Sequence, residues 1–462
     1  MDNTEYMYKV IPPPLHLLVS SPLCIYDWTI LEQQQQLSKS SGGNGIDSVL
    51  EDDTTCIKLA STALSIVLAS PGAIESCATR DSTGATPLHV ALACGARDCV
   101  VEALLTTYPN AACIEDKKGM IPLHWAAAFS KTGHAAIRKL VMAYPLGLTS
   151  ATTDGDIPLH LAVSNAIMEG ESSIGGDGRG SAGKIPSYIG IGDGASSRRE
   201  MNRLKIVELL LHDHTHYTAA SGGNRRNVTT AAATQDPPSN IDEATTTASP
   251  ILTTNREKLT PLHCCALFDA PPQISKLLMK HPDANAASSM TNSFGATPLH
   301  LAAAQPGVSQ SIATVLAIGS PDAAAVQDRL KRTPLHVAAQ NAYATNLLIK
   351  TLAELNPEAA SIKTQRGHLP LHLAAQSQAK EAVVRALIKA YPAAAESRNK
   401  SNNTPLHDAA KYRASLGVVR LLLDAYPGAL YVQNQYGNLP LHCATAYQAP
   451  SDVVQILLKV RS

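Results

Sequence analysis

The sequence has few aromatic residues and no excess of charge of either sign. Only 4% of its 462 residues are aromatic, whereas 45% are hydrophobic, so a core must be built mainly from aliphatic side chains. The 38 basic residues equal the 38 acidic ones, and this balance gives no signal for a nucleic-acid backbone or an anionic membrane. We therefore expect neither of these as a partner.

The sequence also lacks segments that would place it in or across a membrane. No apolar run approaches the ~20 residues that a membrane-spanning helix needs, and the opening MDNTEYMYKV has neither the basic start nor the apolar stretch of a signal peptide. The nine cysteines show no CxxC or metal-ligand spacing, which is typical of buried thiols in a reducing compartment. We expect a soluble protein of the cytoplasm, with the nucleus as the alternative.

One motif, in contrast, is abundant. Pro-Leu-His occurs ten times, and nine copies head segments of similar pattern, starting at Pro87, Pro122, Pro158, Pro261, Pro298, Pro334, Pro370, Pro405 and Pro440. Successive histidines in these nine copies lie 35, 36, 103, 37, 36, 36, 35 and 35 residues apart. A constant period of this size indicates stacked units that cover one another's apolar faces.

The pattern within a unit predicts a turn, a helix, a second turn and a second helix. The motif proline suits the first position of a helix, and Thr precedes it in five copies, where it can cap that helix. Another proline, such as Pro392, falls where the second helix must end. Six copies place Gly three residues before the motif proline, and Asn402 takes that place once, as expected for a turn position with positive φ.

The recurring string D/N-x-x-G-x-T-P-L-H-x-A-A resembles the ankyrin repeat. The resemblance implies an all-α ankyrin-type helical solenoid of about ten stacked repeats with turn or hairpin tips. It also implies that the motif histidines are structural and bond the backbone between neighbouring turns. The chain departs from the usual pattern by lacking Gly-His after the first helix and by ending its second helix with Tyr-Pro-x-Ala-Ala.

Composition and period divide the chain into six segments. Residues 1–72 form a degenerate N-terminal capping repeat with a polar insert, 73–169 are ankyrin-like repeats, 170–200 are a Gly/Ser-rich flexible insert, 201–217 are the second helix of the interrupted repeat, 218–256 are a Thr/Ala/Asn-rich flexible insert, and 257–462 are further repeats. We expect both inserts to be flexible because they cannot bury enough apolar surface to offset the cost of ordering.

Two local patterns invite a catalytic or metal-binding interpretation. We interpret the cluster His212–His216 as a helix-exit loop in preference to a metal site. Gly178–Lys184 copies the glycine spacing of a phosphate-binding loop, but Ile185 stands where Ser or Thr must bind Mg²⁺, and no strand precedes it. No combination of nucleophile, base and orienting acid recurs, so we expect no enzyme, cofactor, metal or small-molecule substrate.

The resemblance implies that a partner protein meets the turn tips and the fourth and fifth residues after the motif histidine. The predicted partner-binding residues are Lys117, Lys118, Phe129, Phe268, Phe294, Gln340, Asn341, Arg366, Gln376, Lys411, Tyr412, Tyr436 and Tyr447. Four of these, Phe129, Phe268, Tyr412 and Tyr447, share the fifth place after the histidine. Large rings held outward are typical binding anchors, but the same position could instead fill the gap between helix ends, and both interpretations stay open.

These observations predict a non-catalytic scaffold or adaptor that binds a partner protein along the concave face of the repeat array. The alternative is a regulatory or targeting subunit of a larger enzyme complex. An enzyme with its chemistry in the inserts is a third, weaker possibility. The fold alone does not decide among them.

Overall fold

The computed structural model describes residues 72–129, 133–164, 200–211, 249–268, 270–305 and 310–459. These residues form α-helices, 3₁₀ helices and turns, and no β-strand occurs among them. The predicted all-α class is therefore confirmed. The chain divides into two compact units, one of residues 1–162 and 166–250 and the other of residues 163–165 and 251–462, and each is described by itself.

The first unit contains the repeats that begin at Pro87 and Pro122 and the start of a third. Its helices are α5 (Ala73–Ala78), α6 (Pro87–Cys94), α7 (Asp98–Thr107), η1 (Pro109–Cys113), α8 (Pro122–Ala128), α9 (His134–Ala143), η2 (Pro145–Leu148), α10 (Pro158–Val163), which ends at the boundary of the unit, and a helix over residues 200–211. Residues 201–211 of this last helix fall in the segment 201–217 predicted as the second helix of the interrupted repeat, and residues 212–217 lie outside the described residues.

The second unit contains six successive repeats. Their helices are α12 (Pro261–Leu267), α13 (Pro272–Leu278), α14 (Ala284–Ser289), α15 (Pro298–Ala304), α16 (Gln310–Gly319), η5 (Pro321–Ala324), α17 (Pro334–Gln340), α18 (Asn346–Leu355), η6 (Pro357–Ala360), α19 (Pro370–Gln376), α20 (Glu381–Ala390), η7 (Pro392–Ala395), α21 (Pro405–Lys411), α22 (Leu416–Ala425), η8 (Pro427–Tyr431), α23 (Pro440–Ala446) and α24 (Ser451–Lys459). Each first helix begins at its motif proline, as predicted.

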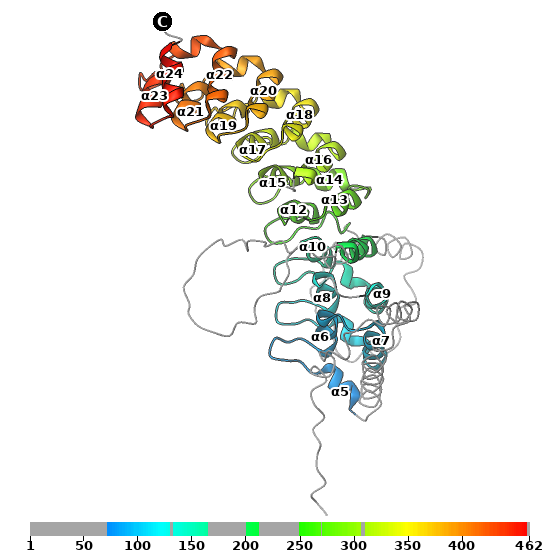
Figure 1. Ribbon diagram of the computed structural model, residues 1–462. Helices are drawn as coiled ribbons and strands as arrows, with labels where there is room; N and C mark the ends of the chain where they lie inside the picture. Colours follow the sequence, from blue (N-terminus) through cyan, green and yellow to red (C-terminus); the bar gives the residue numbers. More distant parts are fainter. Residues whose placement is uncertain are drawn as a thin grey trace, which may run out of the picture. The chain divides into compact units, whose positions relative to one another are not determined.

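The helices of the second unit form two layers. The first helices, from α12 to α23, follow one another along one side, and the second helices, from α13 to α24, follow along the other (Figure 1). The first helices approach closely because small residues occupy their centres, and Ala374 and Ala375 of α19 are fully buried. Leu352 and Leu387 of the second helices fill the space between the layers.

The exit from each second helix is more structured than a simple stop. Tyr391 is extended, with φ −144° and ψ 88°, as the residue before a proline prefers to be, and Pro392 then starts the 3₁₀ helix η7. Ala394 and Ala395 are buried there, at 2% and 3% exposure. The Tyr-Pro-x-Ala-Ala exit therefore needs small residues because this turn packs against α20.

The turn tips form a ladder from one repeat to the next. The side-chain oxygen of Asn399 accepts hydrogen bonds from the backbone N–H groups of Ser401 and Asn403, at 2.9 and 3.0 Å, and this closes the tip. Asn402 has φ +57°, as predicted, and Gly367 has φ +77° in the tip before it. The N–H of Lys400 donates to the carbonyl oxygen of Arg366 at 3.1 Å, which joins the two tips.

One predicted boundary differs from the structure. The second insert was expected to run to residue 256, but Ile251 is fully buried, and the side chain of Asn255 accepts a hydrogen bond from the N–H of Leu259 at 2.9 Å. The tip of the repeat therefore begins before residue 257. The capping repeat up to residue 71, most of both inserts, the His212–His216 cluster and the Gly178–Lys184 loop lie outside the described residues.

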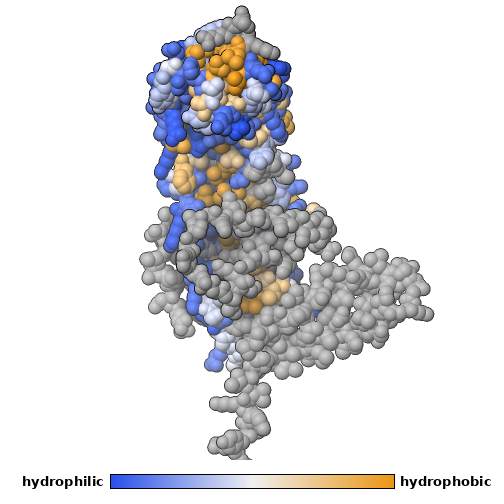
Figure 2. Space-filling view, turned by 60° about the vertical axis from the view of Figure 1, so that its left-hand side comes forward, coloured by the Kyte–Doolittle hydropathy of each residue, from blue (hydrophilic) through white to orange (hydrophobic). Residues whose placement is uncertain are grey.

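Hydrophobic residues gather at the C-terminal end of the second unit. Leu458 is 50% exposed, and Leu441 and Val454 are half-buried. Figure 2 shows a hydrophobic cluster there, framed by hydrophilic residues. Among the helices of the described residues, none combines the length and the apolar character that crossing a bilayer requires.

Candidate functional site

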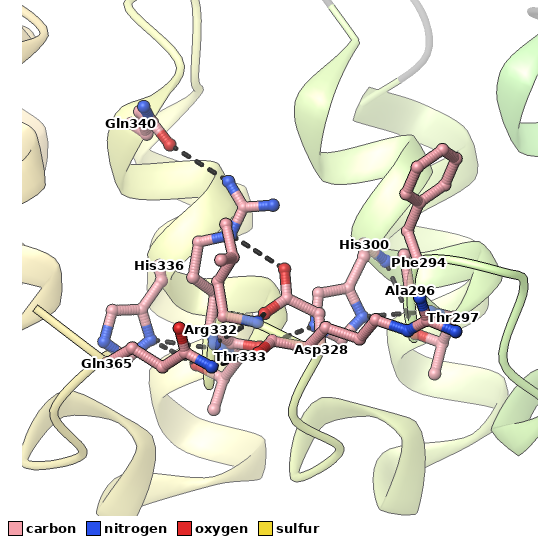
Figure 3. A network of polar contacts seen from close by, with 12 residues as sticks. Phe294, Ala296, Thr297, His300, Asp328, Arg332, Thr333, His336, Gln340 and Gln365 are labelled. Carbon is pink, nitrogen blue, oxygen red and sulfur yellow. Dashed lines mark hydrogen bonds and ion pairs between the residues drawn. The ribbon is translucent and has the colours of Figure 1, made fainter.

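The motif histidines join neighbouring repeats. Nδ1 of His300 accepts a hydrogen bond from the backbone N–H of Thr297 at 3.2 Å, so its proton is on Nε2, which donates to the carbonyl oxygen of Arg332 at 2.9 Å (Figure 3). The same pair of bonds is made by His89, His124, His263, His336, His372 and His407. The structural role expected for these histidines is confirmed.

Burial keeps these imidazoles neutral. It lowers the pKa of His89, His124 and His336 to about 4 and that of His372 to about 3, because an imidazolium there would lose its hydration. With both ring nitrogens occupied, no lone pair is left for a metal ion. Within the part of the chain that the structure describes, no group of three His, Cys, Asp or Glu side chains is arranged to hold one.

The fifth position after the motif histidine has two uses in this protein. Where the residue is polar, it bonds the end of the preceding first helix: Nδ2 of Asn341 donates to the carbonyl oxygen of Gln305 at 2.8 Å, and Oγ of Ser377 donates to that of Ala339 at 3.0 Å. Asn341, predicted to bind a partner, thus has its side-chain amide engaged in repeat stacking. At these two polar positions the side chain therefore joins one repeat to the preceding one.

The aromatic residues at the same position remain partly accessible to solvent. Phe268, Tyr412 and Tyr447 are 40%, 42% and 50% exposed. Phe129 in the first unit is half-buried and packs on Trp125, with 5.8 Å between the ring centres. Three of the four rings therefore have the exposure that a binding anchor needs, whereas the fourth, Phe129, also packs within its own repeat.

Two aromatic residues at the turn tips are more exposed still. Phe294 is 72% exposed and Tyr436 is 74% exposed. Figure 3 shows the ring of Phe294 pointing away from the polar network around Asp328 and Arg332. In that network Arg332 pairs with Asp328 at 2.7 Å and donates to the side-chain oxygen of the predicted residue Gln340 at 3.4 Å.

Two of the exposed rings belong to one cluster. The ammonium nitrogen of Lys411 lies 5.4 Å from the ring centre of Tyr412 and 5.3 Å from that of Tyr447 in the next repeat. Both distances fall within the range of cation–π attraction. We call Lys411, Tyr412 and Tyr447 the Lys411 cluster; all three were predicted as partner-binding residues.

A groove of about 810 Å³ adjoins this cluster in the second unit. It is lined by Lys331, Lys363, Thr364, Gln365, Arg366, His368, Gln376, Asn399, Lys400, Ser401, Asn403, Asp408, Lys411 and Tyr412, and we call it the tip groove. Its walls are the tips that precede α17, α19 and α21, and its floor is formed by the first helices α19 and α21. The groove brings together four predicted residues, Arg366, Gln376, Lys411 and Tyr412.

The floor of the tip groove holds a buried carboxyl group. Asp408 is 2% exposed, and its Oδ2 accepts a hydrogen bond from Nε2 of Gln376 at 3.2 Å. Burial raises the pKa of Asp408 to about 7, although this hydrogen bond and the charge of Lys411 act in the opposite direction. Gln376 also lies 3.4 Å from Nε2 of His368, so it links two ionisable side chains.

Several residues that line this groove were not predicted from the sequence. Lys331, Lys363, Lys400, His368 and Asp408 line it and were not predicted. A signal for Asp408 was present, because it follows its motif histidine where the other eight copies have Val, Trp, Leu or Cys. The predicted tip residues Lys117 and Lys118 are exposed but belong to the first unit, apart from the groove.

Comparison with known proteins agrees with this architecture. A family model of ankyrin repeats, in three overlapping copies, matches residues 303–393, 335–432 and 380–461. Over 116 residues the chain is 33% identical to the SMC5-SMC6 complex localization factor protein 1 of Bos taurus, an alignment that covers 25% of this chain and 10% of that protein. The chain thus matches about a tenth of that relative's length. The matched repeats and the helix pairs headed by Pro-Leu-His identify the chain as an ankyrin-repeat protein.

Proposed function

We propose that this chain is a non-catalytic scaffold or adaptor that binds a partner protein on the face of the second unit formed by its turn tips and first helices. Ankyrin repeats are protein-interaction modules, and this supports the general class. The Lys411 cluster carries the specific proposal. It holds two accessible tyrosine rings from adjacent repeats around one cation, and tyrosines are frequent binding hot spots.

A regulatory or targeting role is the second candidate. The name of the Bos taurus relative describes a localization factor of a protein complex, and it favours a chain that brings a complex to its place of action. The shared segment is short, so this role is a proposal for the present chain. It uses the same binding face and differs only in what the bound partner does.

Affinity capture from a lysate of the source cells, followed by mass spectrometry, tests the proposed function. The baits are the full chain and the same chain carrying Tyr412→Ala and Tyr447→Ala. We expect the intact chain to retain a defined protein set and the double variant to lose it. Co-capture of the subunits of one enzyme complex would favour the targeting role over a simple adaptor.

Tyr431→Ala is the matched control, since this ring is 61% exposed but does not belong to the Lys411 cluster. The control variant is expected to capture the same proteins as the intact chain. Equal capture by all three baits, with thermal melts showing that all are folded, would contradict the proposed binding face. A turnover activity measured for the purified chain would contradict the non-catalytic assignment.

A further inference from the structure

The tip groove is strongly biased toward positive charge. Lys331, Lys363, Arg366, Lys400 and Lys411 line it, against the single carboxyl group of Asp408. That carboxyl is buried on the floor, where its raised pKa leaves it partly protonated near neutral pH. This bias is local, because the whole chain has a formal charge of zero. The groove therefore favours an anionic ligand.

The tips set a regular spacing along the groove. The N–H of Gln365 donates to the carbonyl oxygen of Leu330 at 2.9 Å, and the N–H of Lys400 donates to that of Arg366 at 3.1 Å. Because each tip leads into its own first helix, successive tips are offset by about 8 to 10 Å, the distance that separates packed helices. A peptide in the polyproline II conformation rises about 3.1 Å per residue and completes a turn every three residues, so its side chains three residues apart face the same side about 9 Å apart. Acidic side chains three residues apart would therefore meet the cations of successive tips.

The groove offers more than charge. The half-buried Gln376 amide, bonded to the buried Asp408 carboxyl, lies on the floor, where it can pair with the polar backbone of an extended chain. Tyr412 forms one wall with 42% of its surface exposed, a platform for an apolar side chain between the acidic ones. The guanidinium of Arg366 is exposed at its tip and can hold a carboxylate through two parallel hydrogen bonds.

These features suit a peptide better than a nucleic acid. A nucleic-acid strand needs cations that track its phosphates over a long stripe. Here the cations are gathered in one groove of limited volume, about 810 Å³.

We propose that the tip groove binds an acidic segment of a partner protein in the extended polyproline II conformation. Carboxylates of that segment pair with Lys363, Arg366 and Lys400, and an intervening apolar residue packs on Tyr412. This inference rests on the proposed function and specifies the chemistry of the partner.

Fluorescence anisotropy with the full chain tests the inference. The probe is a fluorescein-labelled peptide of about twelve residues with Glu at every third position and Ser, Gly and Leu between. A second peptide replaces each Glu by Gln. We expect the Glu peptide to bind at least about tenfold more tightly than the Gln peptide and to weaken with added salt.

The variants separate the groove from charge in general. Lys363→Glu, Arg366→Glu and Lys400→Glu are combined in one variant, and Lys350→Glu, Arg385→Glu and Arg420→Glu, exposed on the second helices, are combined in the control. Both sets change the net charge equally. The groove variant is expected to lose at least about tenfold in affinity for the Glu peptide, whereas the control keeps the intact affinity. A version with Gln at the three groove positions repeats the test without charge reversal, should the first variant fold poorly.

Two outcomes would overturn the inference. One is an equal loss in both charge-reversal variants, which would mean nonspecific attraction. The other is an oligouridine of about twenty nucleotides that binds more tightly than the Glu peptide, displaces it and loses its affinity in the groove variant, which would assign the groove to nucleic acid. Partner capture keeps this inference distinct from the proposed function. A groove variant that still captures the partner lost by Tyr412→Ala and Tyr447→Ala removes the acidic-segment proposal and leaves the binding face intact.

Discussion

Nε2 of His336 lies 3.0 Å from the carbonyl oxygen of Ile362, so a single imidazole ties the first helix of one repeat to the backbone of the next. Its Nδ1 accepts the N–H of Thr333 at 3.1 Å within its own repeat. The ring is fully buried, so both bonds are made away from solvent. The seven motif histidines that make both bonds therefore couple each repeat to the next.

Replacing this histidine is expected to weaken folding and not binding. His336→Ala should lower the free energy of unfolding by roughly 1 to 3 kcal/mol, because a buried N–H and a buried carbonyl lose their partners. Urea denaturation measures the loss, and partner capture at a temperature where the variant is folded should be unchanged. His442→Ala is the control, since His442 is exposed in the last repeat, and it should cost less. A variant with intact stability that captures no partner would make His336 a binding residue.

The free energy of unfolding is expected to fall as the pH is lowered below the pKa of a free histidine side chain. Burial lowers the pKa of His89, His124, His300, His336, His372 and His407. The unfolded chain therefore takes up protons near pH 6.5, before the folded chain does. The contribution of these groups is complete above about pH 6.5 and is lost progressively toward about pH 4. The urea midpoint should drop between about pH 7.5 and about pH 5, and a constant midpoint would contradict neutral buried histidines.

The contribution of Asp408 to stability changes with pH in the opposite direction. Its pKa is raised from 3.8 to about 7, so the folded state holds this proton more tightly, and stability is lost as the pH rises through that interval. Asp408→Asn removes the ionisable carboxyl, and with it the loss of stability at high pH, but keeps an oxygen that accepts the hydrogen bond from Gln376. The variant should be more stable than the intact chain by roughly 2 to 4 kcal/mol at about pH 8, and the difference should narrow as the pH falls toward about 4. The difference between the two free energies of unfolding cancels the histidine contribution, which both proteins share. A difference that does not change with pH would contradict a protonated Asp408 in the folded state.

The turn tips provide a paired test of backbone geometry. Gly367 has φ +77°, and a Cβ there would lie 2.8 Å from the backbone nitrogen of Lys400 in the neighbouring tip. Gly367→Ala should therefore destabilise the protein by roughly 1 to 3 kcal/mol through strain and close contact. Asn402→Gly is the control, because Asn402 has φ +57°, which glycine adopts readily. Thermal unfolding should separate the two variants clearly, and equal melting temperatures would show that the tip can relax.

The features predicted correctly from the sequence are those whose cause is local. The motif proline marks the first residue of all nine described first helices because its ring fits only there. Positive φ at Asn402 follows from its place in a four-residue turn. The resemblance to ankyrin repeats added the histidine bonds, which join residues about thirty positions apart.

The tip groove could not be predicted in the same way. Lys331, Arg366 and Lys400 occupy different positions relative to their motif prolines, so no column of the repeat reveals that they face one space. Their proximity depends on the stacking of three repeats. Similarly, nothing local indicated that the amide of Asn341 would bond the preceding helix end while the ring of Tyr412, at the equivalent position, would remain accessible.

Tyr412 distinguishes a binding anchor from a packing residue. Its ring is 42% exposed and lies against the ammonium group of Lys411, so removing it opens little of the core. Tyr412→Ala should weaken binding to the captured partner by about 2 kcal/mol or more, while the free energy of unfolding changes by less than about 1 kcal/mol. Tyr412→Phe keeps the ring and should retain most of the affinity. If the ring instead fills a gap between repeats, Tyr412→Ala should lose roughly 3 to 5 kcal/mol of stability with unchanged affinity once refolded. Measuring both quantities on the same preparations decides between the two roles, because each predicts the effect that the other excludes.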